Sequence, residues 1–586
     1  MKLSPRLAVT LLATSLTLAC AHLGTDRDQE MNTALRSVAT GSRPAYAVND
    51  PEGARLWKQT QSLYEKRSFA PAWVEGAKPR PQMDELIEAL RASASEGLDP
   101  DLYNVNMLEE RRKEASKGFL TDKGFDPKEA GALDVWLTYL YMKYASDIAD
   151  GLSDLAHADP AWKIKPEAFD AQAHLEKAIA DGSIKSSLAE LTPRASEYQR
   201  LRELLVRYKE QQQKGGWPKV PAIKLKPGQK SPHIAVLARR LAASGDYTGS
   251  VPADGAASPY PADLQEAVKV FQRRHGLTDD GAVGPEVVAA LNIPVEYRLN
   301  QIAMNMERWR WLPRDLGERF ILVNIPEMRL DVYEGNNVPL TMRVVVGKQD
   351  TPTPIFNDEM THLVFSPYWN VPDSIAQGET LPSVINDPGF LQRTNMEVVD
   401  KAGKVVDPTS VDLNDPTAYR FRQKPGEDNS LGLVKFMFPN QFNVYLHDTP
   451  ADSLFERAAR SFSHGCVRVE DPVALAQYVL RDQPEWSAER IREAMHAGTE
   501  KHVKLKTSIP VFLGYWTARV RPDNTVQFRK DVYEVDGKLQ ARLNDRLARL
   551  RRSGEAAAVA TTVSNDAASG KPAKKSKDKP AGKNKK

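Results

Sequence analysis

The chain has 586 residues, which is far longer than one hydrophobic core usually supports, so we expect several domains. Charged residues make up 27% of the sequence and hydrophobic residues 41%, as in an ordinary soluble protein. No internal apolar run reaches the length of about 18 residues that a membrane span needs, which argues against a membrane domain in the body of the chain.

The N-terminal segment predicts export. Lys2 and Arg6 precede the apolar run LAVTLLATSLTLA and a group of small residues, a pattern typical of a signal peptide over residues 1–20. Two processing sites compete: Cys20 resembles the lipidated first residue of a lipoprotein, and Ala19-Cys20-Ala21 also fits a small-x-small cleavage site. Either site removes Cys20 from disulfide chemistry, so Cys466 is left alone in an oxidising compartment. We expect a periplasmic or cell-envelope protein with a lipid anchor at Cys20.

The next two segments differ in pattern. Residues 21–45 are polar and unpatterned, which predicts a linker. Residues 46–215 carry apolar residues three and four apart, as in MDELIEALRASASEGL and ALDVWLTYLYMKYASDIADGL, and so predict a helical domain. Nothing in this region has catalytic spacing, so we interpret it as a scaffold domain.

A small helical module is expected over residues 230–295, after a Gly/Pro/Lys-rich boundary. Leu264, Val268 and Phe271 form one helical stripe, and Pro285 is placed to open the next helix. Periodicity alone predicts only a helical hairpin. The run AVKVFQRRHGLTDDGAVGPEVVAALN, however, resembles the type 1 peptidoglycan-binding domain in its F-Q-x-x-x-G-L-x-x-D-G-x-x-G-P pattern. That resemblance implies binding to glycan strands or stem peptides.

The period changes to two from about Phe320, where FILVNIPEMRLDVYEG and LTMRVVVG predict strands. We expect a β-rich domain over residues 318–550, followed by a basic tail over 554–586. The last sixteen residues hold eight Lys and one Asp, a charge of +7, and their composition predicts disorder. The tail is interpreted either as a solubilising segment or as a tether to anionic envelope polymers; nucleic acid is not an expected partner of an exported protein.

The segment RSFSHGCVRVED contains Cys466. A thiol attacks a carbonyl only as the thiolate, so it needs a base and donors for the oxyanion. His447 ends the strand-like run FNVYLH, and the consecutive amides of Gly465 and Cys466 are candidate oxyanion donors. The residues by themselves leave three alternatives open: a catalytic Cys466/His447 pair, a buried inert thiol, or a zinc site that adds His464. The zinc alternative lacks a second cysteine, and a G-x-S-x-G serine elbow is absent.

The chain resembles the signature of L,D-transpeptidases with a YkuD-type catalytic domain in His447 followed by Ser463-His464-Gly465-Cys466. It also resembles the large periplasmic, multidomain branch of that family in the runs NMERWRWLPRDLGERFILVNIPE, SPYWNVPDSIA and YLHDTP. The resemblance implies acyl transfer without metal or organic cofactor. Cys466 would attack the carbonyl of the third, diaminopimelate-type residue of a tetrapeptide stem and expel the terminal D-Ala, which leaves a thioester on the enzyme, with His447 as the base. The product would be a 3→3 cross-link between peptidoglycan stem peptides.

The resemblance also suggests roles for the neighbouring residues. We expect the backbone carbonyl of Asp448 to orient the imidazole. Tyr445 comes two residues before His447 on a predicted strand and should face the same side, where its hydroxyl is an oxyanion or substrate donor or its ring simply packs. His464 and Ser463 are expected to fix the turn, although the Ser463 hydroxyl could instead orient the thiol. Arg468 stands where many members have Asn, and its role is open between a substrate carboxylate clamp and a structural ion pair.

The Pro/Gly-rich segment 370–440 is predicted to be an insertion that caps the cleft and excludes water. Just before it, Tyr368 and Trp369 are expected either to line the cleft or to pack in the core. The expected fold class is therefore multidomain α+β: a mainly helical scaffold, a small helical peptidoglycan-binding module and a β-rich catalytic domain. Alternatives with the same nucleophile are an L,D-carboxypeptidase and attachment of proteins to peptidoglycan; the non-enzyme alternative is a structural wall-binding protein.

Overall fold

The computed structural model describes residues 28–568 except 76–77, 120–125, 153–160, 254, 256, 388, 411, 413–414 and 416–417. The predicted signal segment with Cys20, and residues 569–586 of the basic tail, lie outside the described residues. The chain divides into two compact units, each described here by itself. The first takes the chain up to Leu155, then Ala168–Thr192, and the part from Gln540 onward; the second takes Ala156–Glu167 and Pro193–Leu539.

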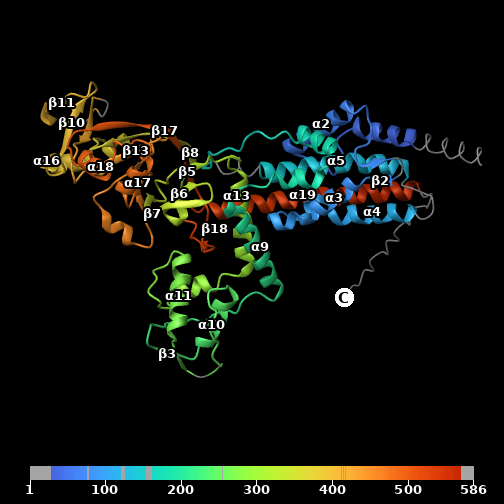
Figure 1. The fold of residues 1–586 in the computed structure, drawn as a ribbon, viewed down its shortest axis with the longest axis horizontal. Helices are drawn as coiled ribbons and strands as arrows, with labels where there is room; N and C mark the ends of the chain where they lie inside the picture. The colour runs from blue at the N-terminus through green and yellow to red at the C-terminus, as the bar shows by residue number, and fades with distance from the viewer. Residues whose placement is uncertain are drawn as a thin grey trace, which may run out of the picture. The chain divides into compact units, whose positions relative to one another are not determined.

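The first unit is a helical bundle (Figure 1). Its helix α5 (Pro127–Ala149) is buried along nearly its whole length. The carboxylate of Asp134 on α5 accepts hydrogen bonds of 2.7–3.1 Å from three consecutive amides of residues 72–74. The other elements are α2 (Pro51–Lys66), β1 (Val74–Glu75), β2 (Lys78–Pro79), α3 (Pro81–Ala92), η1 (Ser93–Glu96), η2 (Pro100–Tyr103), α4 (Val105–Phe119), α7 (Ala171–Asp181) and α8 (Ile184–Ala189).

Two segments at the ends of the chain differ from the prediction. Residues 28–39 form a helix rather than part of a linker over 21–45, because Met31, Leu35 and Ala39 recur at helical spacing and are buried. The helix α19 (Val535–Ala568) runs into the segment that was expected to be disordered from residue 554, because an alanine-rich run there favours a helix. In the first unit Arg546 of α19 is buried and forms ion pairs with Asp50 and Glu52.

The helix α9 (Ser196–Gln213) lies in the second unit, although the sequence placed it in a scaffold domain over residues 46–215. An ion pair, in addition to apolar packing, holds α9 in the second unit. The buried carboxylate of Glu197 accepts a hydrogen bond of 2.9 Å from Nε of Arg519, which is also buried and belongs to β18 (Ala518–Val520). Separating α9 from β18 would leave the carboxylate of Glu197 without its guanidinium partner in a dry interior.

The second unit also contains the small helical module. Its helices are α10 (Ile234–Ala243), α11 (Ala262–Arg274) and α12 (Pro285–Leu291), joined by the pair β3 (Lys230–Ser231) and β4 (Ser258–Pro259). Their apolar faces form one core, which includes the predicted stripe of Leu264, Val268 and Phe271. The helical module predicted from the sequence is confirmed, because its helices share a hydrophobic core of their own.

The β-rich part of the second unit is built on a nine-stranded sheet with the order β15-β7-β16-β14-β13-β8-β17-β5-β6. A further pairing of β6 with β7 closes the sheet on itself. The strands are β5 (Arg319–Asn324), β6 (Arg329–Glu334), β7 (Asn337–Gly347), β8 (Phe356–Phe365), β13 (Val434–Met437), β14 (Leu446–His447), β15 (Ser461–Ser463), β16 (Val467–Val469) and β17 (Lys501–Gly514). Around it lie α13 (Val295–Arg310), η3 (Ile325–Glu327), η6 (Asp452–Glu456), α17 (Pro472–Val479), α18 (Ala488–Met495) and β19 (Val526–Phe528).

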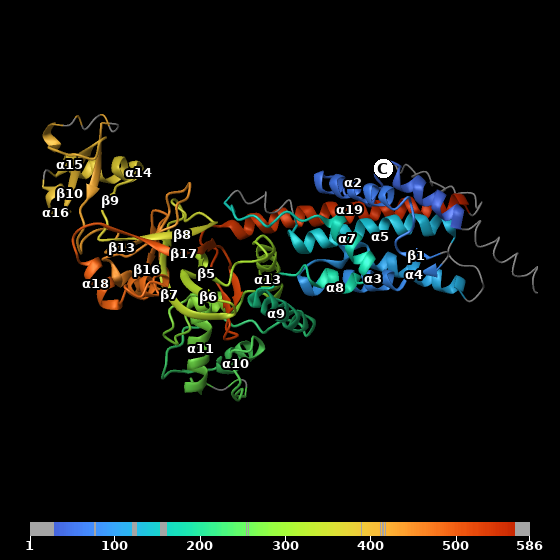
Figure 2. The same ribbon diagram turned by 45° about the horizontal axis from the view of Figure 1, so that its top comes forward.

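A small lobe is inserted into this domain (Figure 2). Its sheet has the order β11-β10-β12-β9, and its core contains Val371, Val398, Tyr419 and Phe421. The elements are β9 (Trp369–Asn370), α14 (Asp373–Ile375), η4 (Ala376–Thr380), α15 (Leu381–Asn386), α16 (Phe390–Arg393), β10 (Met396–Asp400), β11 (Val405–Val406), η5 (Pro408–Ser410) and β12 (Tyr419–Gln423). The lobe is shorter than the predicted insertion over 370–440, because β13 belongs to the large sheet: Val434 and Phe436 alternate inward on it.

The fold class predicted from the sequence is confirmed in its main parts: helical regions precede, in sequence, a β-rich domain that contains an inserted lobe.

Candidate active site

The candidate residues lie on one face of the large sheet. In the register, His447 on β14 stands opposite Arg468 on β16, and opposite Lys435 on β13. The next row of side chains across these strands points to the other face of the sheet and is fully buried. It consists of Phe436, Leu446 and Val467. Because side chains alternate along a strand, Tyr445 and Cys466, two residues before His447 and Arg468, share the polar face.

Cys466 is a free thiol, half-buried, next to Tyr445. The backbone N–H and the hydroxyl of Tyr445 are both placed to donate to the sulfur, and these bonds lower the pKa of Cys466; burial raises it, and burial wins. The sulfur also lies 3.9 Å from the carbonyl oxygen of Asn443. The unliganded thiol is therefore protonated at neutral pH but already faces two donors that can stabilise a developing charge.

His447 is buried, with 4% of its surface exposed, and its ring is fixed by its neighbour. Nδ1 lies 2.6 Å from the carbonyl oxygen of Asp448, so it carries the proton and donates, which leaves Nε2 as an acceptor. Burial, with a smaller effect of Arg468, lowers the pKa of His447 to about 3. The ring of Tyr445 meets that of His447 edge to face, with centroids 5.7 Å apart. The imidazole of His447 is therefore neutral, and the carbonyl of Asp448 orients its ring.

The side chain of Asp448 takes no part in that contact. Its two oxygens accept from the amides of Leu433 at 2.8 Å and Thr449 at 2.7 Å. Gly432 has a φ of +61°, and a Cβ there would collide with this carboxylate, so glycine is required. Asp448 thus positions the imidazole through its carbonyl and anchors a loop through its carboxylate.

The turn before Cys466 is closed by Ser463. Its hydroxyl donates to the carbonyl of Cys466 at 2.5 Å and accepts from the amide of Gly465 at 3.1 Å. It does not contact the thiol. The Gly465 amide is therefore already used, which corrects the expectation that it would be an oxyanion donor beside the amide of Cys466. Gly465 has a φ of +116°, a conformation that non-glycine residues rarely adopt.

Two residues that the sequence analysis did not identify, Thr353 and Tyr533, hold this turn through hydrogen bonds. The hydroxyl of Thr353 donates to the carbonyl of Gly465 at 2.8 Å and accepts from the amide of Gly347 at 2.9 Å. Tyr533 donates to the carbonyl of Gly347 at 2.9 Å and accepts from the amide of Thr353 at 3.1 Å. None of these residues lies near Cys466 in sequence. The only local signal is the run DTPTP, which indicates a rigid turn but no function.

His464 points away from the turn that it was expected to fix. Its Nε2 lies 2.8 Å from the Glu379 carboxylate, on η4 of the inserted lobe. Both side chains are substantially exposed. The contact joins the lobe directly to the loop that carries Cys466. Trp369 packs against the core of the lobe rather than standing free, and the backbone of Tyr368, the residue before it, contacts both Lys435 and Glu500.

Arg468 forms no ion pair among the described residues, and its Nε is buried without a hydrogen-bond partner there. Burial lowers the pKa of this guanidinium, whereas the nearby Cys466 raises it. Of the two expected roles, the structural ion pair is therefore not observed in the described part of the chain. The guanidinium remains beside the thiol with unused donors.

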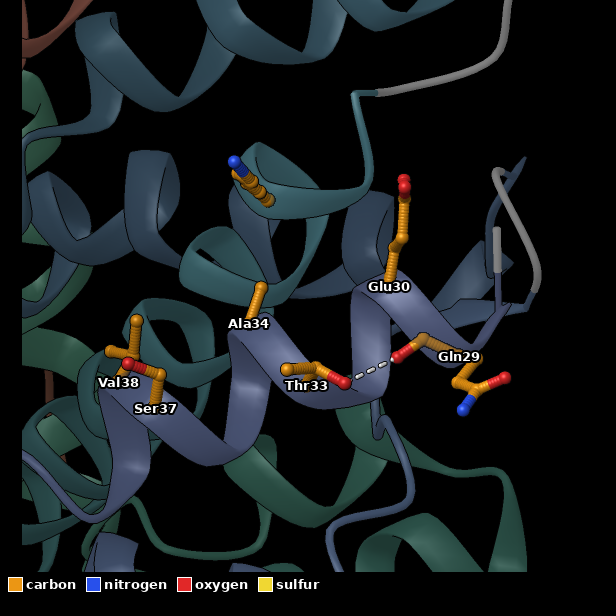
Figure 3. Close-up of a pocket in the computed structure, with 7 residues that line it drawn as sticks. Gln29, Glu30, Thr33, Ala34, Ser37 and Val38 are labelled. Carbon is orange, nitrogen blue, oxygen red and sulfur yellow. Dashed lines mark hydrogen bonds between the residues drawn. The ribbon is translucent and has the colours of Figure 1, made fainter. Parts of the chain in front are cut away.

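Three further observations concern metal binding, a surface hollow and membrane spans. In the described ranges, no group of three or more His, Cys, Asp and Glu side chains is arranged to hold a metal ion, so the zinc alternative of His447, His464 and Cys466 lacks a donor cluster. A surface hollow of about 750 Å³ lies in the first unit, lined mainly by the helix over residues 28–39 and by Lys128 (Figure 3). On its wall, Thr33 donates to the backbone of Gln29 at 2.8 Å, and the lining offers no nucleophile–base pair. No described helix is long and apolar enough to cross a membrane.

Three parts of the chain match known families. Residues 318–504 match the L,D-transpeptidase catalytic domain (YkuD), residues 230–291 match a family described as "Putative peptidoglycan binding domain", and residues 58–205 match one described as "Scaffold domain". A Haemophilus influenzae protein named "Putative L,D-transpeptidase" is 35% identical over 239 residues, which are 40% of this chain. The match takes in 48% of that protein, so the chain spans about half the length of this curated relative.

Solved structures give weaker likenesses. An L,D-transpeptidase from Mycobacterium smegmatis is 15% identical, with a TM-score of 0.17, and the match covers 33% of this chain and 58% of that one. An L,D-transpeptidase from Xylanimonas cellulosilytica is also 15% identical, with a TM-score of 0.16, and the match covers 50% of this chain and 99% of that one. At these TM-scores the structural likenesses do not define the fold.

Proposed function

This chain carries a YkuD-type L,D-transpeptidase catalytic domain beside a peptidoglycan-binding domain, and we propose that it forms 3→3 cross-links between peptidoglycan stem peptides, with Cys466 as the nucleophile and His447 as the base. One observation carries the proposal. The thiol, a neutral and oriented imidazole, and the hydroxyl of Tyr445 share one face of the sheet. Nucleophilic acyl transfer requires these three functions: a nucleophile, a proton acceptor and a donor for the oxyanion.

The first half of the reaction is acylation. The Cys466 sulfur attacks the carbonyl of the third, diaminopimelate-type residue of a donor tetrapeptide, and the thiol proton passes to Nε2 of His447. The tetrahedral intermediate then collapses. The bond to D-Ala breaks, the departing amine takes the proton from the imidazolium, and a thioester remains on Cys466.

The second half regenerates the enzyme. The side-chain amine of a second stem attacks the thioester, His447 accepts its proton, and the sulfur leaves and is reprotonated. A buried imidazole with a lowered pKa is neutral when each proton must be accepted and returns that proton readily. Since the Gly465 amide is bound to Ser463, the oxyanion donors are the amide of Cys466 and the hydroxyl of Tyr445.

Arg468 is assigned to the substrate. It lies on the polar face two residues after Cys466 and has no carboxylate partner among the described side chains. A guanidinium with free donors in a partly buried position binds a carboxylate strongly. We assign it to the terminal carboxylate of the donor, next to the scissile bond.

The acceptor distinguishes this function from its alternatives. Water in place of the amine gives an L,D-carboxypeptidase, and a protein amine gives attachment of that protein to the wall. The inserted lobe touches the nucleophile loop through Glu379 and His464, a position from which it can exclude water. That contact favours transfer to an amine over hydrolysis.

The setting of the reaction follows from the domains. Peptidoglycan is an envelope polymer, so both peptidoglycan-related domains imply a location in the cell envelope. The helical module would hold the enzyme on glycan strands or stem peptides. We further propose an export signal over residues 1–20, a lipid anchor at Cys20, and a basic tail that contacts anionic envelope polymers.

Product analysis tests the proposal. The enzyme is incubated with disaccharide-tetrapeptide, and the products are separated and sequenced by mass spectrometry. A dimer linked through the third residues of both stems, with one D-Ala released per link, supports the transpeptidase. Tripeptide as the sole product supports the carboxypeptidase, and unchanged tetrapeptide contradicts both.

A further inference from the structure

Lys435 lies on the same polar face as Cys466 and His447, and the proposed reaction leaves it without a role. It stands directly opposite His447 in the register between β13 and β14, as Arg468 does on the other side. Neighbouring strands are about 4.8 Å apart, so the two cationic residues flank the imidazole with about 10 Å between their strands. The ammonium also lies 5.9 Å from the ring centroid of Tyr445.

Lys435 is half-buried, and its ammonium group has few hydrogen-bond partners. Its one hydrogen bond among the described residues is a long one of 3.4 Å, to the carbonyl of Tyr368. Burial lowers its pKa, and Glu500 opposes that effect. An ammonium group has three donors, so two remain for another partner.

Glu500 is the carboxylate whose charge raises the pKa of Lys435, but its two oxygens contact other groups. One of its oxygens accepts from the amide of Tyr368 at 2.8 Å, and the other faces Nε2 of His502 at 3.3 Å. It forms no ion pair with Lys435 within the described residues. His362, the remaining titratable neighbour, has its pKa lowered by burial, by His502 and by Lys435, so it supplies no negative charge. A partly buried cation without a counter-ion is costly unless a ligand provides the charge.

We propose that Lys435 binds the side-chain carboxylate of the third residue of the donor stem and thereby selects stems that carry diaminopimelate there. The inference rests on the proposed function for the identity of the ligand. Arg468, nearer to Cys466, takes the terminal carboxylate of the leaving D-Ala. In an extended stem these two carboxylates are separated by on the order of 10 Å, which matches the spacing of the two cationic strands.

Equilibrium binding tests this assignment without turnover. Disaccharide-tetrapeptide is titrated into Cys466→Ala and into Cys466→Ala/Lys435→Gln, in three forms: unmodified, amidated at the diaminopimelate side-chain carboxylate, and amidated at the terminal carboxylate. We expect Lys435→Gln to weaken binding of the unmodified stem about tenfold, the size of a charge-assisted hydrogen bond. The same substitution should change the affinity for the side-chain amide by less than about twofold, because the partner of Lys435 is then absent.

Two controls accompany the titrations. Lys435→Arg keeps the charge and should restore most of the affinity. Lys504→Gln changes an exposed lysine of β17 and should leave affinity unchanged. Unmodified and amidated stems are also compared on the Cys466→Ala protein that retains Lys435, and that comparison does not depend on how well the Lys435→Gln protein folds.

Three results would overturn the inference: an equal loss with all three stems, a loss that disappears only with the terminal amide, or no loss at all. If the wild-type protein forms cross-links while one of these patterns is seen, the inference fails and the proposed function stands. If the expected pattern is seen but wild-type protein never reacts with the stem, the proposed function fails and the carboxylate site stands.

Discussion

The hydroxyl of Thr353 donates a hydrogen bond of 2.8 Å to the carbonyl of Gly465, the residue before the nucleophile. The same hydroxyl accepts from the amide of Gly347, and Thr353 is 1% exposed. One side chain from a distant turn therefore fixes the backbone that presents Cys466.

Thr353→Val keeps the shape of this side chain but leaves a buried carbonyl and a buried amide without partners. We expect a loss of about 1–3 kcal/mol in the stability of the catalytic domain. We also expect acylation to slow by about tenfold, since small displacements of a nucleophile are costly. Thermal unfolding and the rate of acyl adduct formation measure the two effects. Thr353→Ser, which keeps the hydroxyl, is the control; a Val variant with wild-type stability and rate would show that the contact is unimportant.

The pH dependence of thiol alkylation follows from the pKa values of the pair. Burial raises the pKa of Cys466, and His447 is neutral because burial lowers its pKa to about 3. The thiolate fraction therefore rises with pH throughout the neutral range, and the rate of reaction with iodoacetamide should increase about tenfold per pH unit between about pH 6 and 9. A rate that is constant between about pH 5 and 8 would instead indicate a stable thiolate–imidazolium pair and contradict the neutral-pair assignment.

Tyr445→Phe removes one donor while keeping the edge-to-face contact with His447. We expect kcat/KM for cross-linking to fall by about 100-fold, the usual size for an oxyanion donor. Because the Tyr445 hydroxyl also lowers the pKa of Cys466, the alkylation profile should move to higher pH. Tyr297→Phe is the matched control, because it makes the same substitution at a half-exposed position on α13. Loss of turnover without any shift of the alkylation profile would mean that the hydroxyl does not face the sulfur.

Glu379→Gln weakens the contact between the inserted lobe and His464. Exposed ion pairs contribute about 0.2–1 kcal/mol, so we expect the ratio of hydrolysed tripeptide to cross-linked dimer to rise by no more than about fivefold, with acylation unchanged. Chromatographic quantification of both products measures this ratio. Glu427→Gln, which alters another exposed carboxylate near a histidine, should leave it unchanged. A ratio that is equal in wild type and Glu379→Gln would rule out a role of this contact in excluding water.

Much of the architecture could be predicted from the sequence because the signals were local. Leu264, Val268 and Phe271 recur at helical spacing, and the alternation in FILVNIPEMRLDVYEG is that of strands. Cys466 and His447 were identified as a pair from residue chemistry and a family resemblance. Their placement on one face follows from the parallel pairing of β14 with β16, which no local pattern specifies.

The parts that could not be predicted depend on contacts between distant segments. Lys435 was overlooked because Gly and Pro residues on both sides of β13 hide a four-residue strand. Glu379 and Thr353 lie 85 and 112 residues from the partners they contact, His464 and Gly465. The helix over residues 28–39 was missed because its apolar stripe of Met31, Leu35 and Ala39 lies in an otherwise polar segment.

The most direct measurement is the intact mass of the purified protein, wild type and Cys466→Ala, after incubation with disaccharide-tetrapeptide. Wild type should gain the mass of the stem minus D-Ala, and the adduct should disappear when a second stem is added as the acceptor. Cys466→Ala should gain nothing. An adduct of equal amount on both proteins, or no adduct on wild type under conditions in which D-Ala is released, would contradict a thioester on Cys466.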